Sequence, residues 1–268
     1  MNHLLRELAP ITDRGWEELD EEARSQLVVT LAARKLVDFS GPHGWERAAT
    51  SLGRTEPLPG TFVEGVDAQR RRVLPLVEAR APFTLARAEL EAIDRGAEDV
   101  DLDPLDEAAR RIALVENTAI FKGWADAGIT GIVEASPHET IALTDDMNAC
   151  PRHVAEAVEV LLRNGIEGPY GLALDPTVYR RVIETTEHGG YPLFDHLRQI
   201  LDGPIVWSPG VNGAVVLSQR GGDFLFESGE DLAIGYRSHD ADAVQLYLVE
   251  TFTFRVATPE AALALPNA

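Results

Sequence analysis

The sequence predicts an α+β fold in which a platform, built on one long helix and one long strand, carries an inserted α/β unit. Three observations predict this arrangement. A helical apolar pattern covers residues 103–128, a strand pattern with one apolar face covers residues 244–255, and short helices alternate with short strands between them. A chain of 268 residues can bury a sizeable core, as one large domain or two small ones.

Two helices are predicted at the N-terminus. Within residues 3–11, one helical face collects the apolar side chains Leu4, Leu5, Leu8 and Ile11. After Thr12, apolar residues recur at steps of three and four from Trp16 to Leu31, which indicates a second amphipathic helix. Either the rest of the chain or a partner must cover these two faces.

The periodicity disappears between Phe39 and about Arg72. This stretch holds five glycines and three prolines and has no strong helix or strand signal. A structureless stretch of about 30 residues is uncommon inside a compact domain, and is usually functional or disordered. Because Trp45, Phe62 and Val63 argue against simple disorder, we expect an extended arm that packs on a neighbouring subunit.

The helix over residues 103–128 begins with Asp103 and Pro104, a favourable cap and first-turn pair, and is expected to end at Gly128. At about 1.5 Å per residue it would exceed roughly 30 Å, the length of a spine rather than a connector.

The inserted unit begins at about residue 129. Residues 169–174 are typical of a buried strand, and residues 175–187 predict a capped helix with Val178, Val182 and Ile183 inward. A second helix follows, up to Leu201. Two further strands are predicted over residues 204–207 and 213–218.

The charge and composition exclude several classes of protein. Asp and Glu number 44 against 24 Lys and Arg, a formal net charge of −20, and such a surface repels phosphate backbones. No apolar run approaches the roughly 18–20 residues of a membrane span. The N-terminus does not resemble a signal peptide, and Cys150 stands alone. We therefore expect a cytoplasmic protein without nucleic-acid or membrane partners.

Sequence motifs for catalysis do not occur. The nucleophile elbow G-x-S-x-G, the zinc motif H-E-x-x-H and the glycine motifs of nucleotide-binding loops are missing, and the seven histidines are scattered. We interpret Cys150 as a small core or loop cysteine, and the acidic cluster between Asp94 and Asp103 as solvated surface. We expect no enzyme activity, no metal and no cofactor.

Residues 184–197, ETTEHGGYPLFDHL, place a polar, glycine-rich turn between two helical stretches. Such a tip fits a catalytic loop, a metal site or the rim of a hole, and its residues alone leave these open. Gly-Gly and Tyr-Pro are also ordinary turn chemistry. A metal at this tip would need His188, Asp195 and His196.

Four segments together resemble the encapsulin shell proteins, namely residues 75–96, 115–123, 188–197 and 220–254. The last of them, RGGDFLFESGEDLAIGYRSHDADAVQLYLVETFTF, argues most strongly against chance similarity. The resemblance extends from residue 4 nearly to the C-terminus. It is strongest to actinobacterial, linocin-type members that are associated with dye-decolourising peroxidase cargo.

The resemblance implies a phage-capsid-like (HK97) fold and an icosahedral shell of on the order of sixty copies, or a multiple. It further implies a peripheral domain built from three segments: the N-terminal helices (1–38), a segment with the spine helix (73–128) and a segment with the C-terminal strand (224–268). The remaining segments would be an E-loop arm (39–72) and an axial domain (129–223).

The resemblance also implies two functional regions. A cargo protein would be held inside the shell by its C-terminal targeting peptide, which would bind Leu5, Leu8, Ile11, Leu31, Arg34, Asp38, Asp231 and Ile234. A pore at the fivefold axis would be lined by Glu187, His188, Gly189, Gly190 and Tyr191.

Two other functions compete with a compartment shell that encloses a peroxidase or a ferritin-like protein. One is the major capsid protein of an HK97-type phage or prophage. The arm over residues 39–72 contains no lysine, which excludes the lysine cross-linking from the arm that some such capsids use. The other is a secreted bacteriocin or protease, against which the missing signal peptide and nucleophile motif argue.

Overall fold

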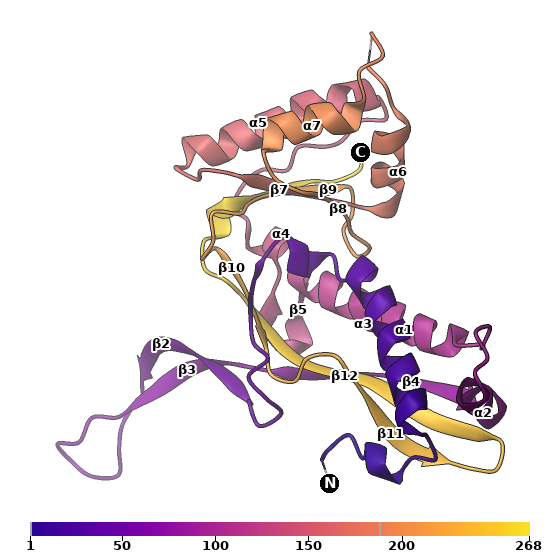
Figure 1. Ribbon diagram of the computed structural model, residues 1–268. Helices are drawn as coiled ribbons and strands as arrows, with labels where there is room; N and C mark the ends of the chain where they lie inside the picture. The colour runs from indigo at the N-terminus through magenta and orange to yellow at the C-terminus, as the bar shows by residue number, and fades with distance from the viewer. Residues whose placement is uncertain (1, 188) are drawn as a thin grey trace.

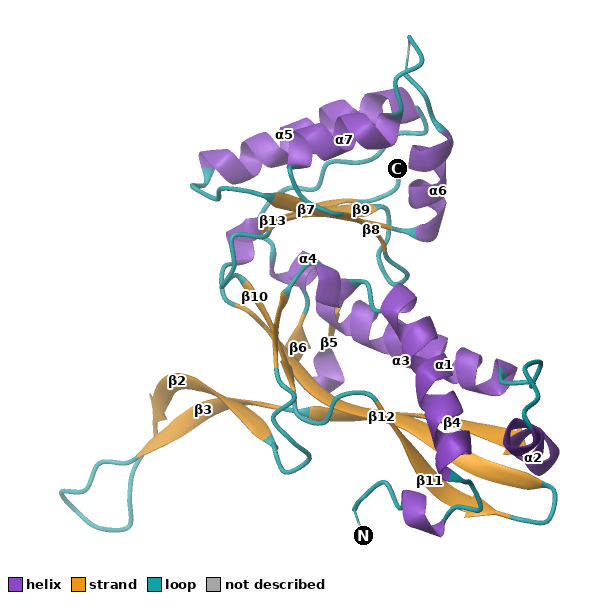
Figure 2. Ribbon diagram, viewed as in Figure 1, coloured by secondary structure: helices purple, strands orange, loops and turns teal. Residues whose placement is uncertain are grey.

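The computed structural model describes residues 2–187 and 189–268. The chain forms two packed units and a projecting arm (Figures 1 and 2). We call the unit with the larger sheet the platform and the unit with the smaller sheet the axial unit. The arm leaves one end of the platform, and the axial unit lies above the part of the platform that contains β10 and α4 in this view (Figure 1).

Two of the α-helices, α1 and α6, begin at a side-chain cap. Thr12 Oγ1 accepts a hydrogen bond from the Gly15 amide (3.1 Å) at the start of α1 (Asp13–Thr30). Asp175 Oδ1 accepts from the Thr177 and Val178 amides (2.8 Å each) at the start of α6 (Pro176–Glu184). The other helices are α2 (Arg87–Arg95), α3 (Asp103–Phe121), α4 (Ile132–Ala135), α5 (Cys150–Arg163) and α7 (Leu193–Leu201), with the short 3₁₀ helices η1 (Arg6–Leu8), η2 (Ala33–Lys35), η3 (Ala125–Ala127), η4 (Met147–Ala149) and η5 (Pro259–Ala261).

The platform sheet is organised around its longest strand. This strand, β12 (Ala243–Val256), pairs antiparallel with β4 (Val77–Ala86), β10 (Phe224–Ser228) and β11 (Ala233–His239). Strand β1 (Asp38–Ser40) adds parallel to β10. The spine helix α3 and helix α1 pack on this platform (Figure 1).

The prediction of a long strand with one apolar face is confirmed by β12, and the opposite face of this strand is largely buried as well. Leu246 and Phe254 lie in the main core, whereas Tyr247 and Val249 form a second small cluster with Leu4. The N-terminal segment therefore covers part of this opposite face.

The helix predicted over residues 3–11 is reduced to the single turn η1. The segment before it runs along the edge of β11 instead. The Tyr236 amide donates to the Leu4 carbonyl (2.8 Å), and Arg6 Nε donates to the Ile234 carbonyl (2.9 Å). The bond to the Leu4 carbonyl replaces the one that this carbonyl would have accepted within a helix.

The spine helix α3 ends at Phe121 rather than at Gly128. Gly123 has a φ of +99°, and an added Cβ there would lie 2.5 Å from Glu134 Oε2. The left-handed conformation favours glycine and stops the helix. The chain then forms the small hairpin β5 (Gly123–Trp124) and β6 (Ile129–Thr130).

The arm is a β-hairpin, which corrects the prediction of a stretch without strands. Strand β2 (Ala49–Pro57) pairs antiparallel with β3 (Gln69–Pro75), and residues 58–68 form its tip. Most of its side chains are exposed. Because this hairpin has no buried face within the chain, its sequence lacks the apolar alternation that reveals other strands.

The axial unit contains the predicted strands and helices around a small sheet. Its strand order is β13–β9–β7–β8, with α5 and α7 along one face (Figures 1 and 2). Ile183 was predicted to point inward and is 56% exposed, whereas Val178 and Val182 are buried. The strands are β7 (Tyr170–Leu174), β8 (Ile205–Trp207), β9 (Ala214–Ser218) and β13 (Ala262–Leu265).

The C-terminal segment does not stay within the domain expected for it. Residues 224–268 were expected to belong to the peripheral domain, and β10, β11 and β12 do lie in the platform sheet. Strand β13 instead pairs antiparallel with β9 in the axial sheet.

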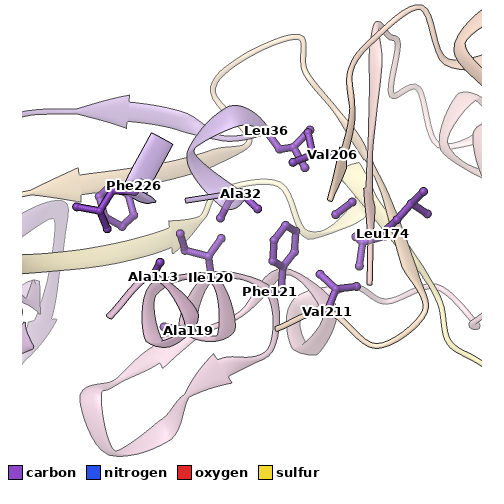
Figure 3. Close-up of a cluster of buried hydrophobic side chains, with 14 of the residues drawn as sticks. Ala32, Leu36, Ala113, Ala119, Ile120, Phe121, Leu174, Val206, Val211 and Phe226 are labelled. Atoms are coloured by element: carbon purple, nitrogen blue, oxygen red, sulfur yellow. The ribbon is translucent and has the colours of Figure 1, made fainter. Parts of the chain in front are cut away.

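The two units share one hydrophobic core. Figure 3 shows Phe121, at the end of α3, and Leu36 facing residues of the axial unit. On the axial side they meet Leu174 of β7, Val206 of β8 and Val211. This junction fixes the axial unit on the platform.

Candidate functional site

A groove of about 660 Å³ lies between the N-terminal segment, the second half of α1 and strand β11. Its apolar side chains include Leu4, Leu27 and Leu248, and Val28 lies on its rim, 62% exposed. We call it the N-terminal groove. The full lining comprises Leu4, Arg6, Asp20, Ala23, Arg24, Leu27, Val28, Leu31, Arg34, Lys35, Asp231, Leu232, Ala233, Ile234 and Leu248.

Arg6 holds one wall of the groove. Its Nη1 donates to Asp20 Oδ2 (2.9 Å), and its guanidinium lies 4.3 Å from the centroid of the Trp16 ring. Together with the bond from Arg6 Nε to the Ile234 carbonyl, these contacts tie η1 to both α1 and β11. The wall is therefore preformed in the free subunit.

A buried ionic cluster forms the end of the groove. Arg34 Nε donates to both carboxylate oxygens of Glu116 (3.0 and 2.8 Å) on the spine helix. Its Nη1 donates to Asp231 Oδ1 (2.7 Å) and its Nη2 to Glu250 Oε2 (3.2 Å) on β12. The rings of Phe39 and Phe226 also lie about 5 Å from this guanidinium (5.1 and 5.0 Å).

Burial raises the pKa of both glutamates in this cluster, Glu116 and Glu250. It raises that of Glu250 well above its ordinary value, with the neighbouring Glu116 raising the pKa of Glu250 further. For Arg34, burial lowers the pKa, but Glu116, Glu250 and Asp231 outweigh it and raise the pKa. Arg34 thus stays charged, and Glu250 holds a proton most readily. Among the described residues, Glu250 Oε1 is buried without a hydrogen-bond partner.

The structure brings together half of the residues predicted to bind cargo. Leu31, Arg34, Asp231 and Ile234 line the N-terminal groove. The predicted residues did not include much of its apolar wall, such as Leu27 and Val28, which lie near the end of α1 just before Leu31.

The other four predicted residues lie elsewhere. Leu8 is 49% exposed on η1, and Leu5 lines a separate hollow of about 500 Å³ beside Arg80 and Tyr236. Ile11 packs close to Gly15 at the start of α1. Asp38 Oδ2 accepts a hydrogen bond from the Gly222 amide (2.6 Å), which holds the turn before β10.

The loop between α6 and α7 projects beyond the axial unit (Figure 1). The Glu187 amide donates to the Tyr191 carbonyl (2.8 Å), and Gly189 and Gly190 have φ values of +103° and +83°. An added Cβ at either glycine would meet no atom within 4 Å, so backbone conformation rather than crowding favours glycine there. His188 lies outside the described residues.

Two of the predicted pore residues are held by α7. The Glu187 carboxylate lies 3.0 Å from His196 Nδ1, and Gln199 Nε2 donates to the Tyr191 hydroxyl (2.8 Å). The side chains of the turn are thus oriented by the helix behind it. Among the described residues, no group of three or more His, Cys, Asp or Glu could hold a metal ion.

Two further findings concern sites outside the groove and the loop. Burial raises the pKa of the Cys150 thiol to about 11, so the thiol stays protonated in the core. Within the described residues, no helix is both long and apolar enough to cross a membrane.

Solved structures identify the fold. The virus-like particle from Pyrococcus furiosus matches with a TM-score of 0.64, over 91% of this chain and 98% of that chain, at 17% identity. The capsid of the Myoviridae phage XM1 matches with a TM-score of 0.56, over 88% and 91%, at 9% identity. The protein therefore has the HK97-like fold of capsid proteins.

Sequence relatives define the family within this fold. The family model described as "Encapsulating protein for peroxidase" matches residues 1–253. A type 1 encapsulin shell protein from Rhodospirillum rubrum is 52% identical over 270 residues, which cover 99% of this chain and 96% of the relative. Another, from Mycolicibacterium paratuberculosis, is 46% identical over the full length of both chains (100% each). This chain belongs to the encapsulin shell protein family.

Proposed function

We propose that this chain is a non-enzymatic shell subunit whose copies assemble into a closed cytoplasmic compartment around a cargo protein. The observation that carries the proposal is the arm. Its tip presents Leu58, Phe62, Val63 and Val66 to solvent, and Phe62 is fully exposed. A projecting hairpin with an apolar tip is stable in water when another copy covers it.

The capsid-like fold and the family support a closed shell rather than an open polymer. A contact between an arm and a different surface of the next copy is heterologous, and such contacts form rings when the rotation closes. An icosahedral arrangement would contain on the order of sixty copies, or a multiple.

Within this shell we propose a role for each candidate region. The N-terminal groove binds the C-terminal targeting peptide of the cargo, for which its apolar wall and its basic and acidic ends are suited. The loop between α6 and α7, including Glu187, Gly189, Gly190 and Tyr191, lines a pore that admits small molecules. The description of the family favours a peroxidase as cargo, and a ferritin-like protein is the alternative.

Electron microscopy and light scattering of the purified protein test the shell. We expect uniform round particles from the natural chain, and free subunits from Phe62→Asp, which places a charge at the apolar tip. Leu162→Asp is the matched control, because Leu162 is a 56% exposed apolar residue on α5 rather than on the arm. Particles of normal size from Phe62→Asp would remove the arm tip from assembly, and small species from the natural chain would overturn the proposed function.

A further inference from the structure

The two strands of the arm are basic although the chain is strongly acidic, whereas the tip of the arm holds Glu64 and Asp67. Strands β2 and β3 hold four arginines, Arg54 and Arg70–Arg72, against one acidic residue, Glu56, whereas the chain as a whole has a net charge of −20. Residues 70–72 are also the longest basic run in the sequence. Positive charge is thus concentrated on the two strands of the arm, which projects from one end of the platform (Figure 1).

Two of these arginines form an unfavourable cross-strand pair. Arg54 lies directly opposite Arg72 in the register of the hairpin, so both side chains emerge on the same face. Arg70 Nε donates to Glu56 Oε1 (2.5 Å), so the carboxylate of these two strands is paired with Arg70 rather than with Arg54 or Arg72. In the part of the chain that the structure describes, Arg54 and Arg72 have no ion pair and are exposed. The arm therefore presents two adjacent guanidinium groups that lack an anion.

The matching negative charge lies at the other end of the platform. From the loop after α2 to the first residue of α3, the exposed side chains of Glu98, Asp99, Asp101 and Asp103 follow one another within six residues, 98–103. Among the described residues, none of these four carboxylates is in an ion pair with an arginine, lysine or histidine of the same chain. We call residues 98–103 the acidic segment.

The arm and the acidic segment are joined by one extended path. Strand β3 leads through Leu76 into β4, and β4 leads directly into α2. The ten residues of β4 span about 33 Å, and Figure 1 shows the arm and α2 at opposite ends of the platform. Opposite charges at the two ends of one subunit suit a head-to-tail contact, which repeats from each copy to the next.

We propose that Arg54 and Arg72 of the arm bind the acidic segment of a second copy of this chain. The contact holds the arm on that segment, because opposite charges attract and form charge-assisted hydrogen bonds. The inference rests on the proposed function, since it names the surface that receives the arm when subunits assemble. It also predicts that assembly weakens with salt, because the screening length falls from about 10 Å at 0.1 M to about 3 Å at 1 M.

Charge reversal and charge exchange test the contact. The chain with Arg54→Glu and Arg72→Glu should need at least about tenfold more protein to form particles, measured by light scattering at low salt. Arg54→Lys with Arg72→Lys keeps the charge, and Arg163→Glu reverses an exposed arginine on α5; both controls should assemble like the natural chain. Adding Glu98→Arg and Asp99→Arg to the first variant should restore assembly, because both sides of the contact are then reversed.

The outcomes separate this inference from the proposed function. If the natural chain forms no particles, the proposed function fails. If the natural chain assembles and the charge-reversed arm assembles at the same protein concentration, the inference alone is overturned. It is also overturned if the reversed arm fails and the exchanged chain fails too, because the acidic segment is then not the partner of the arm.

Discussion

Arg34 connects three separate elements through carboxylates. It contacts Glu116 on the spine helix, Glu250 on the terminal strand and Asp231 in the turn before β11. Removing one partner from a buried ionic cluster typically costs about 3–5 kcal/mol, because the remaining charges stay buried without compensation. The cluster is therefore a structural anchor at the end of the N-terminal groove, and its protonation affects the stability of the subunit.

Glu250→Gln should flatten the pH dependence of stability. Burial raises the pKa of Glu250 above the value near 4.3 of an unfolded glutamate. Its contribution to stability is thus fully present below about pH 4.3 and is lost as the pH rises through the folded pKa. Glutamine keeps a hydrogen-bonding group but does not ionise. We expect the melting temperature of the natural chain to fall more between about pH 5 and about pH 9 than that of Glu250→Gln.

Glu107→Gln is the control for this measurement, because Glu107 is an exposed glutamate on the same platform. Its melting curve should follow that of the natural chain at every pH. Parallel curves for the natural chain and Glu250→Gln would show that Glu250 is ionised in the folded protein across this range.

Val28→Asp should reduce cargo loading without preventing shell formation. Val28 lies on the rim of the N-terminal groove and is 62% exposed, so the change spares the core but places a carboxylate beside Leu27 and Leu31. We expect at least about tenfold less of a co-expressed peroxidase with its C-terminal tail in purified shells, measured by gel densitometry. Val29→Asp, at a neighbouring 59% exposed position outside the groove lining, should load normally. Equal loading of both variants would place the cargo site elsewhere.

At the scale of elements, the sequence predicted those that bury a regular apolar face. Helix α1 and strand β7 were predicted because their buried residues recur with helical spacing or form one short run. The arm strands were missed because backbone pairing holds them and their side chains remain exposed. The N-terminal turn was mispredicted because hydrogen bonds to β11, which lies more than two hundred residues away in sequence (|i−j| of 228 for Arg6 and Ile234), decide its conformation.

The candidate sites, too, could be predicted only as far as local sequence patterns and the family resemblance locate them. The four groove residues found from the sequence lie on segments that the family resemblance identified, whereas Leu8 fell outside the groove once its helix shortened to η1. The pairing of Glu187 with His196 depends on the angle between a turn and the following helix, which periodicity does not encode.

Glu187→Gln should change which ions enter the assembled shell. In the proposed pore, copies of Glu187 around a symmetry axis give the opening a negative field that favours cations. With a dye-labelled dextran trapped during assembly, stopped-flow quenching by thallium(I) and by iodide reports cation and anion entry. We expect Glu187→Gln to lower the ratio of cation to anion entry rates, and Glu184→Gln, an exposed glutamate at the end of α6, to leave it unchanged. An unchanged ratio for Glu187→Gln would mean that ions enter through another opening.

At the scale of the whole molecule, the axial unit is fixed to the platform by a shared core rather than by a linker. Phe121 is fully buried at the end of the spine helix and faces axial residues such as Leu174 (Figure 3). A hinge between the two units would require this core to open.

Phe121→Ala should destabilise both units together. Removing a buried phenylalanine ring typically costs about 3–5 kcal/mol, because apolar contacts are lost and a cavity remains. Unfolding in guanidinium is followed by circular dichroism for the whole chain and by the fluorescence of Trp207, on β8 of the axial unit, isolated by comparison with Trp207→Phe. We expect the two signals to change at the same denaturant concentration in the natural chain and to shift together in Phe121→Ala. Val63→Ala, on the exposed arm tip, should change the free energy of unfolding obtained from either signal by no more than about 0.5 kcal/mol. If Phe121→Ala shifted the circular dichroism signal while Trp207 fluorescence stayed at its original midpoint, the axial unit would fold independently and the shared core would not couple the two units.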